Sequence, residues 1–254
     1  MLMILESIFL GLVQGLTEWL PISSSGHLVI AQELLKIEVP LLFDVMLHFG
    51  TVLAVFAFFW KDILKILKSL FKLDFKSQDG KLGLYIIIGN IPVALAGYFL
   101  HDVFESLFSN LFVVGIALIV TGILLFLTKF TKGRRKLNVF DSILVGIAQT
   151  FALIPGLSRS GSTISTGLFR GLDKESIFKF SFLLAVPAVI GGNLLELNQT
   201  LGEVDLLPMV VGTVTAAIVG YLSLKFLFKT LQKGKFYLFS VYCWFVGVIL
   251  LLLI

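Results

Sequence analysis

Six stretches of the chain contain almost only apolar residues, and each has about the length of a bilayer-spanning helix. A helix that crosses the hydrocarbon core needs about 20 residues. The stretches are 41–60, 82–100, 109–128, 176–195, 206–228 and 236–254. The pattern therefore predicts six full transmembrane helices.

Two further apolar stretches, 1–36 and 138–170, are interrupted near their middle by proline and serine residues. Pro21 interrupts the first, and Pro155 interrupts the second. Non-helical backbone at membrane depth is tolerated only where protein or a water-filled cavity covers it. We therefore expect two re-entrant helix hairpins. With the six spans, they make an all-α polytopic membrane protein whose single membrane domain covers 1–254.

The two interrupted stretches contain the same polar phrase. A shift of 135 residues superimposes five pairs: Gly11 on Gly146, Gln14 on Gln149, Ser23 on Ser158, Ser25 on Ser160, and Gly26 on Gly161. The chain is therefore predicted to consist of two repeats, at about 1–128 and 137–254. The charged residues of the two phrases differ, since the first contains Glu18 and His27 and the second contains Arg159.

The composition supports the membrane assignment. Hydrophobic residues make up 57% of the chain and charged residues only 14%, against roughly 25% charged residues in soluble domains. Cys243 is the only cysteine, so no disulfide can form within the chain. The N-terminus has no basic region and Glu6 interrupts its apolar run, so we expect it to belong to the mature fold.

The basic residues give the expected topology. Eighteen of the 20 Lys and Arg lie in 61–81, 129–136, 170–179 and 225–235. If every span crosses, all four clusters fall on one face, which the positive-inside rule makes cytoplasmic. The same placement of the basic residues in loops between spans argues against a nucleic-acid partner. The hairpins then enter from opposite faces, which gives an inverted-topology repeat with its site near the midplane.

The serine clusters and Arg159 suggest an anion site. Serine caps helix N-termini, and a free helix N-terminus attracts anions. Burying Arg159 in the membrane costs at least about 2.5–3.5 kcal/mol. Its guanidinium group has two parallel N–H donors, called the arginine fork below, which match the oxygens of a phosphate group. The alternative is a structural ion pair with Glu18. The predicted substrate-binding residues are Gln14, Ser23, Ser25, Ser158, Ser160, Gly161, Ser162 and Thr163.

Glu18, Ser24 and His27 are the candidate catalytic residues beside Arg159. A carboxylate, a hydroxyl and an imidazole can supply a base, a nucleophile or a metal ligand. The alternative for His27 is a hydrogen-bonded packing residue. His48 and His101 have no comparable neighbours in the sequence, and both are expected to be structural.

These motifs resemble the undecaprenyl-diphosphate phosphatase family (UppP, also called BacA or bacitracin-resistance protein). The resemblance covers essentially the whole chain. It rests on the (Glu/Gln)-x-x-x-Glu stretch from Gln14 to Glu18, on Pro21 to His27, and on the Pro-Gly-x-Ser-Arg-Ser-x-x-Thr stretch from Pro155 to Thr163. Gln14 takes the Gln option of the first motif. A weaker match is 91–97.

The resemblance implies a function. Such enzymes remove the terminal phosphate of a C55 isoprenoid diphosphate and release the monophosphate carrier lipid for peptidoglycan synthesis. Loss of the lipid diphosphate pool underlies the bacitracin phenotype. It also implies a divalent cation, Mg²⁺ or Ca²⁺, a homodimer, and a site that faces the periplasm or outside of a bacterial inner membrane.

The mechanism predicted from these residues is open at two points. Ser24 is the expected nucleophile with His27 as its base, and direct attack by water fits almost as well. Glu18 is expected either to bind the cation or to activate water. A lipid or anion transporter is the alternative function, because inverted repeats with broken helices are a transporter architecture. A purely structural scaffold is disfavoured by the buried Arg159.

Overall fold

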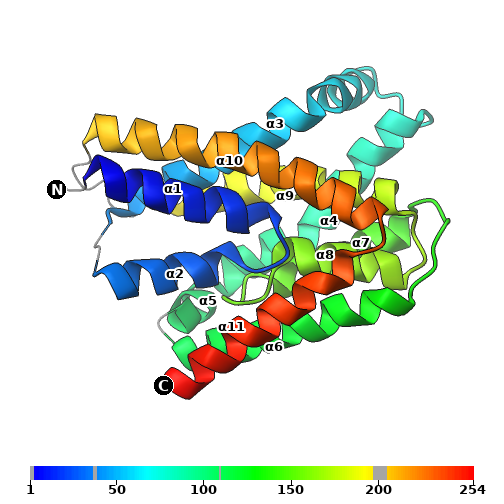
Figure 1. Cartoon of the computed structure of the whole chain (residues 1–254). Coiled ribbons are helices and arrows are strands. Elements are labelled where there is room, and N and C mark those ends of the chain that lie inside the picture. Colours follow the sequence, from blue (N-terminus) through cyan, green and yellow to red (C-terminus); the bar gives the residue numbers. More distant parts are fainter. Residues whose placement is uncertain (1–2, 37–38, 109, 197–204) are drawn as a thin grey trace.

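The computed structural model describes residues 3–36, 39–108, 110–196 and 205–254, and these residues are mostly helical (Figure 1). The α-helices and two short 3₁₀ helices are, in chain order, α1 (Ile4–Trp19), α2 (Ser24–Leu35), α3 (Leu41–Phe71), α4 (Gln78–Phe99), α5 (His101–Phe108), α6 (Leu111–Leu127), η1 (Thr128–Phe130), α7 (Val139–Phe151), α8 (Arg159–Phe169), α9 (Lys174–Glu196), α10 (Leu206–Gln232), η2 (Phe236–Leu238) and α11 (Phe239–Leu253).

The prediction of six spans is confirmed by length and composition. Within the described residues, six helical stretches are long and apolar enough to cross a membrane: Leu41–Phe71, Gln78–Phe99, Leu111–Phe130, Lys174–Leu194, Leu206–Gln232 and Phe236–Leu253. The first is longer than predicted, because α3 continues through a lysine-containing segment as far as Phe71. The sequence pattern did not predict α5, which is too short to cross.

The two predicted breaks are also present. Helix α1 ends at Trp19 and α2 begins at Ser24, whereas α7 ends at Phe151 and α8 begins at Arg159. Figure 1 shows α2 running back beside α1 after the first break. Each interrupted stretch is therefore a pair of short helices, joined by residues 20–23 in the first case and by residues 152–158 in the second, and each connection ends in a serine.

Matched glycines allow each half of the chain to pack closely on the other half. Helix α1 lies against α10, and a Cβ added at Gly11 would be 2.6 Å from the carbonyl oxygen of Gly212. Helix α7 lies against α4, and a Cβ at Gly146 would collide with the backbone of Gly89. Gly11 and Gly146 occupy the same place in the repeated phrase, so this repeated residue serves helix contact in both halves.

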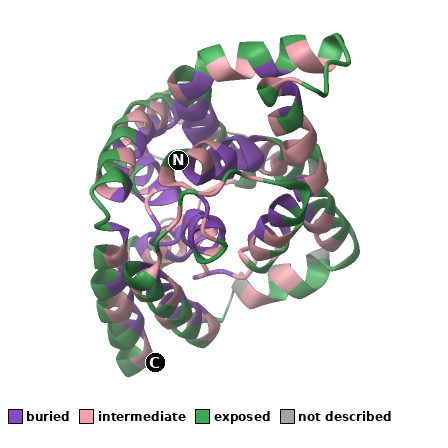
Figure 2. Cartoon of the chain, turned by 90° about the vertical axis from the view of Figure 1, so that its right-hand side faces the viewer, coloured by how far each residue is buried: buried purple, intermediate pink, exposed green. Residues whose placement is uncertain are grey.

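The helices of the two halves interlock. The last spans of the halves, α6 and α11, contact each other, and so do the first spans, α3 and α9. Buried residues gather toward the middle of the bundle, and exposed ones toward its outer surface (Figure 2). The breaks in the helices therefore lie where both halves contribute to one interior.

An aromatic cluster supports the site. Trp19 is almost fully buried, and its ring meets Phe182 edge-on with centroids 5.3 Å apart. Phe182 in turn packs on Phe178, with centroids 4.5 Å apart. Because Trp19 is the last residue of α1, this packing fixes the position at which the first break begins.

Candidate functional site

The two breaks are joined by hydrogen bonds, although they lie more than 130 residues apart in the chain. The Ser23 hydroxyl accepts the backbone N–H of Gly156 at 3.2 Å. Thr121 of α6 holds the second connection from the other side, donating to the carbonyl of Gly156 and accepting the N–H of Ser158, both at 3.1 Å. The connections therefore form one rigid unit.

The repeated serines cap the two helices in the same way. Ser23 accepts the N–H of Gly26 at 3.4 Å, and Ser158 accepts the N–H of Gly161 at 3.1 Å. Each capping hydroxyl also lies 3.3 Å from the hydroxyl two residues later, Ser25 or Ser160. The matched polar positions are thus used for helix capping, which stabilises a helix start by about 1 kcal/mol.

The repeated glutamines lie beside these caps. Gln14 donates to Glu18 at 3.1 Å, and Gln149 donates to the side-chain oxygen of Asn90 at 3.2 Å. The side-chain oxygen of each glutamine is buried without a hydrogen-bond partner. Both amides therefore keep an unused acceptor in the interior.

A cavity of about 460 Å³ lies at the joined breaks. Of the predicted site residues, all of which are described, six line it: Glu18, Ser23, Ser24, Ser25, Ser158 and Arg159. Its other walls are largely apolar and come from α3, α4, α5, α9 and the residues after α7. The space therefore combines a small polar end with surfaces suited to a hydrocarbon chain.

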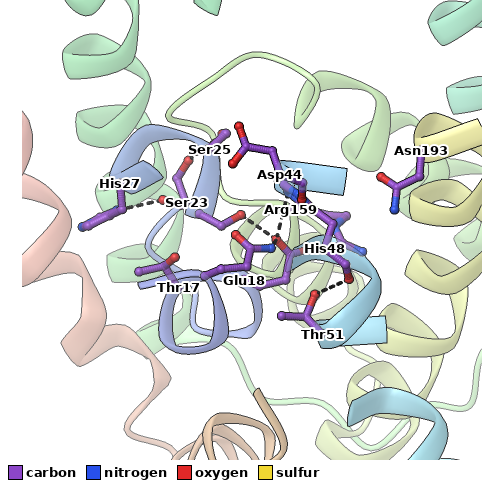
Figure 3. Close-up of polar contacts among 12 residues, drawn as sticks. Thr17, Glu18, Ser23, Ser25, His27, Asp44, His48, Thr51, Arg159 and Asn193 are labelled. Carbon is purple, nitrogen blue, oxygen red and sulfur yellow. Dashed lines mark hydrogen bonds and ion pairs between the residues drawn. The ribbon is translucent and has the colours of Figure 1, made fainter. Parts of the chain in front are cut away.

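Glu18 accepts hydrogen bonds from three side chains at the polar end. An amino group of Arg159 donates to Oε1 (Figure 3). Ser24 and Gln14 donate to Oε2 at 2.6 and 3.1 Å. The ion pair that the sequence left as an alternative is thus formed. It uses only part of the arginine fork, because Nη1 of Arg159 is buried without a partner.

Arg159 is held in place by stacking as well as by this pair. Its guanidinium carbon lies 5.1 Å from the ring centroid of Trp19, a favourable cation–π distance. The fork is therefore positioned before any ligand arrives, with one amino group still unsatisfied.

The electrostatics of the cavity favour an anion. Its ionisable lining residues, among those the structure describes, are Glu18, His48 and Arg159. The first residues of both α2 and α8 also line it, and a helix start carries free N–H groups and a partial positive charge. One carboxylate thus faces one arginine and two helix N-termini.

Ser24 is the serine of its cluster whose hydroxyl faces a base. Ser23 is a cap, and Ser25 pairs with Ser23. Ser24 alone of the three has a hydrogen bond to Glu18, at 2.6 Å. This geometry favours Ser24 as the predicted nucleophile.

His27 lies away from this group. Its Nδ1 is 2.7 Å from the carbonyl of Ser23 and its Nε2 is 2.7 Å from the hydroxyl of Tyr242. Figure 3 shows its ring turned away from Glu18, and it does not line the cavity. Its role as a base stays a prediction, although these contacts favour positioning of the serine connection.

The later residues of the second motif are engaged within the protein. The Ser162 N–H donates to the Ser158 carbonyl at 2.8 Å, and the Thr163 hydroxyl pairs with Ser181 at 2.6 Å. Five of the predicted substrate-binding residues do not line the cavity: Gln14, Ser160, Gly161, Ser162 and Thr163. Their predicted binding role stays a prediction, and the structure gives them a supporting position.

Sequence reasoning missed His48 as a candidate. This residue lines the cavity and its Nε2 lies 3.9 Å from Oε2 of Glu18. It sits within an uninterrupted span, so no proline or serine cluster marks it. The available signal was a histidine inside an apolar helix, four residues after Asp44.

A resident cation at Glu18 does not fit this arrangement. Both carboxylate oxygens already accept from donors. In the part of the chain that the structure describes, no group of three or more His, Cys, Asp or Glu side chains is placed to hold a metal ion. The metal role predicted for Glu18 therefore stays a prediction.

The fold and the cavity define a polytopic helical membrane protein whose cavity has one polar end and largely apolar walls. The sequence model of the family described as bacitracin resistance protein BacA matches residues 7–249, and the chain belongs to that family.

Relatives named undecaprenyl-diphosphatase match nearly the whole chain. The one from Halothermothrix orenii is 42% identical, with 98% of each chain covered. The one from Carboxydothermus hydrogenoformans is 43% identical and covers 98% of this chain and 96% of its own. The relative from Korarchaeum cryptofilum is 41% identical over 99% of each.

Proposed function

We propose that the protein is a membrane phosphatase that hydrolyses undecaprenyl diphosphate to undecaprenyl phosphate and inorganic phosphate. The names of the relatives support this activity. The observation that carries it is the half-used fork of Arg159, buried beside the Ser24–Glu18 pair. Release of the monophosphate lipid returns it to peptidoglycan synthesis and accounts for bacitracin resistance.

The polar end and the apolar walls of the cavity suit the diphosphate and the first part of the isoprenoid tail of such a substrate. The isoprenoid tail would lie along the apolar walls formed by residues such as Val93 and Val189. The diphosphate would lie at the polar end, against Arg159 and the free N–H groups at the starts of α2 and α8. Phosphate oxygens would then satisfy Nη1 of Arg159.

The geometry supports a reaction in which Ser24 attacks the terminal phosphorus. Glu18 accepts the serine proton through the existing 2.6 Å hydrogen bond. Arg159 stabilises the charge on the transferring phosphoryl group, since positioning and electrostatics dominate phosphoryl transfer. In the alternative reaction, Glu18 activates a water molecule in the place of the Ser24 hydroxyl.

A divalent cation enters this proposal only with the substrate. Mg²⁺ is commonly held by substrate phosphates and few protein ligands. Mg²⁺ or Ca²⁺ on the diphosphate would neutralise part of its charge, and we assign no residue of the chain to it.

We also propose the finer topology of two re-entrant hairpins in inverted repeats, with the site open to the outer face of a bacterial inner membrane. Three observations support it: the exchanged packing of α1 on α10 and α7 on α4, the matched caps, and the placement of the basic clusters. The homodimer stays a prediction from the family resemblance.

Cysteine labelling tests this topology. In a Cys243→Ser background, Asp205→Cys places a single thiol at the start of α10, and Lys132→Cys places one just after α6 and η1. The start of α10 and the end of α6 lie at opposite ends of the bundle (Figure 1). A membrane-impermeant maleimide should label position 205 in intact cells and position 132 only after permeabilisation. The reverse pattern would overturn the orientation.

The activity is tested with purified protein and undecaprenyl diphosphate in detergent, with Mg²⁺ or Ca²⁺ present. Inorganic phosphate should appear in equal amount to the monophosphate lipid, and Arg159→Ala should remove the activity. No phosphate release, together with protein-dependent movement of the lipid in vesicles, would favour the transporter instead.

A further inference from the structure

We propose that His48 is the proton acceptor of this site, taking from Glu18 the proton that the attacking hydroxyl loses. The proposal rests on the phosphatase function above and adds a residue that lies outside both copies of the repeated phrase. It depends on the tautomer of the ring, its position in the cavity, and its relation to the oxygen that Ser24 contacts.

The hydrogen bond on the far side of the ring sets the tautomer of His48. Its Nδ1 lies 2.9 Å from the backbone carbonyl oxygen of Asp44, one helical turn earlier. A carbonyl oxygen only accepts, so Nδ1 carries the hydrogen. In the neutral ring, Nε2 then has a free lone pair. The helix therefore presents the basic nitrogen to the cavity, and 28% of the side chain is exposed there.

Nε2 of His48 lies near the carboxylate oxygen of Glu18 that accepts the hydrogen bond from Ser24. Nε2 of His48 lies 3.9 Å from Oε2 of Glu18, and the Ser24 hydroxyl donates to the same oxygen at 2.6 Å. Two acceptors cannot hydrogen-bond to each other, which accounts for a separation beyond hydrogen-bond length. One proton arriving at Oε2 would turn this contact into a hydrogen bond.

Glu18 needs such an acceptor. Arg159, Ser24 and Gln14 all donate to its carboxylate, and donors of this kind favour the charged form. While Glu18 holds the proton from Ser24, it is neutral and no longer forms an ion pair with Arg159. Passing the proton to His48 restores the carboxylate and places a positive imidazolium near the phosphates.

The step balances in atoms and charge. The bond from Ser24 Oγ to the terminal phosphorus forms, and the bond from that phosphorus to the bridging oxygen breaks. The electron pair leaves with the lipid monophosphate, and the serine proton moves to Glu18 and then to His48. In the second step, the oxygen of a water molecule bonds to phosphorus, the bond from phosphorus to Ser24 Oγ breaks, and a proton of that water returns to Ser24 Oγ. The proton on His48 is released to solvent.

The other histidine near the site is not available for this task. Both ring nitrogens of His27 are engaged, with the Ser23 carbonyl and the Tyr242 hydroxyl. The remaining ionisable groups of the cavity lining, as far as the structure describes it, are Glu18 and the permanently charged Arg159. His48 therefore has the free basic nitrogen among these residues.

Two amide substitutions separate proton transfer from hydrogen bonding. In His48→Asn, the side-chain N–H can replace Nδ1 as donor to the backbone carbonyl oxygen of Asp44. No atom of the asparagine replaces Nε2. In His48→Gln, the longer side chain brings an amide near the Nε2 position, where it can accept a hydrogen bond but cannot take a proton. Both variants should lose about 10²-fold or more of the phosphate-release rate.

Chemical rescue completes the test. Activity of His48→Ala should rise with added imidazole, while the wild-type rate should not, and thermal unfolding in detergent checks that each variant is folded. Near-normal turnover in either amide variant, or folded His48→Ala protein that imidazole does not restore, would overturn the proposal. Wild-type protein without phosphate release would overturn the proposed function instead.

Discussion

The hydroxyl of Ser24 donates a 2.6 Å hydrogen bond to Glu18, across the break that separates α2 from α1. The same carboxylate pairs with Arg159 from the second half of the chain. A nucleophile, a base and a cation are therefore assembled only when the two interrupted stretches meet. The repeated serines and glycines cap the helices and allow them to pack closely. The proposed catalytic residues Glu18, Ser24 and Arg159 differ between the two copies of the phrase.

Ser24→Ala should abolish phosphate release, because it removes the hydroxyl proton that faces Glu18. The rate is measured with undecaprenyl diphosphate labelled in its terminal phosphate, and acid quenching of wild-type protein should trap labelled phosphoserine. Ser25→Ala is the matched comparison and should lose less activity than Ser24→Ala, since the Ser25 hydroxyl pairs with the capping hydroxyl of Ser23 and not with Glu18. Substantial turnover in Ser24→Ala would point to direct attack by water.

Arg159→Lys should lower the phosphate-release rate about 10²–10³-fold, the usual effect of losing one donor to transition-state charge. An ammonium cannot contact Glu18 and a phosphate with the geometry of the fork. Arg134→Lys, at an exposed arginine in the loop before α7, should leave the rate unchanged. Equal rates for Arg159→Lys and wild type would contradict the proposed role of Arg159 in stabilising the transferring phosphoryl group.

His27→Asn distinguishes positioning from base catalysis. The asparagine N–H can still donate to the Ser23 carbonyl, which holds a residue in the unusual conformation φ 71°. If His27 positions the serine connection, this variant should keep at least about a tenth of the wild-type rate, since a general base contributes 10²–10⁴-fold. A loss as complete as that of Arg159→Ala would return His27 to the role predicted from its motif.

Gly11→Ala should destabilise the protein by about 1–3 kcal/mol, the usual cost of overpacking. The added Cβ meets the backbone of Gly212, which cannot move aside as a flexible side chain would. Thermal unfolding in detergent measures the change. Gly191→Ala is the control within α9, because a Cβ there meets open space. An equal melting temperature for the two variants would contradict the close approach of α1 and α10.

The sequence predicted the spans and the breaks because both depend on local signals. Long apolar runs and prolines followed by serines determine where these helices begin and end. The capping role of Ser23 and Ser158 followed from the same local chemistry.

The direction of single side chains depended on packing between distant helices and was harder to predict. His27 follows the serine cluster directly, but Tyr242 of α11 binds its ring on the side away from Glu18. Thr163 turns toward Ser181 of α9 for a similar reason. His48 reaches the cavity because α3 packs beside α1. No sequence motif predicted this helix contact.

The most direct test of the account compares wild-type protein with Glu18→Gln in one assay of undecaprenyl diphosphate hydrolysis. Glutamine keeps the size of the side chain but can neither accept the serine proton nor pair with Arg159. We expect equal amounts of phosphate and lipid monophosphate from the wild-type protein, and a hydrolysis rate lower by at least about 10²-fold in the folded variant. Absence of phosphate from wild type, or equal rates for both proteins, would contradict it.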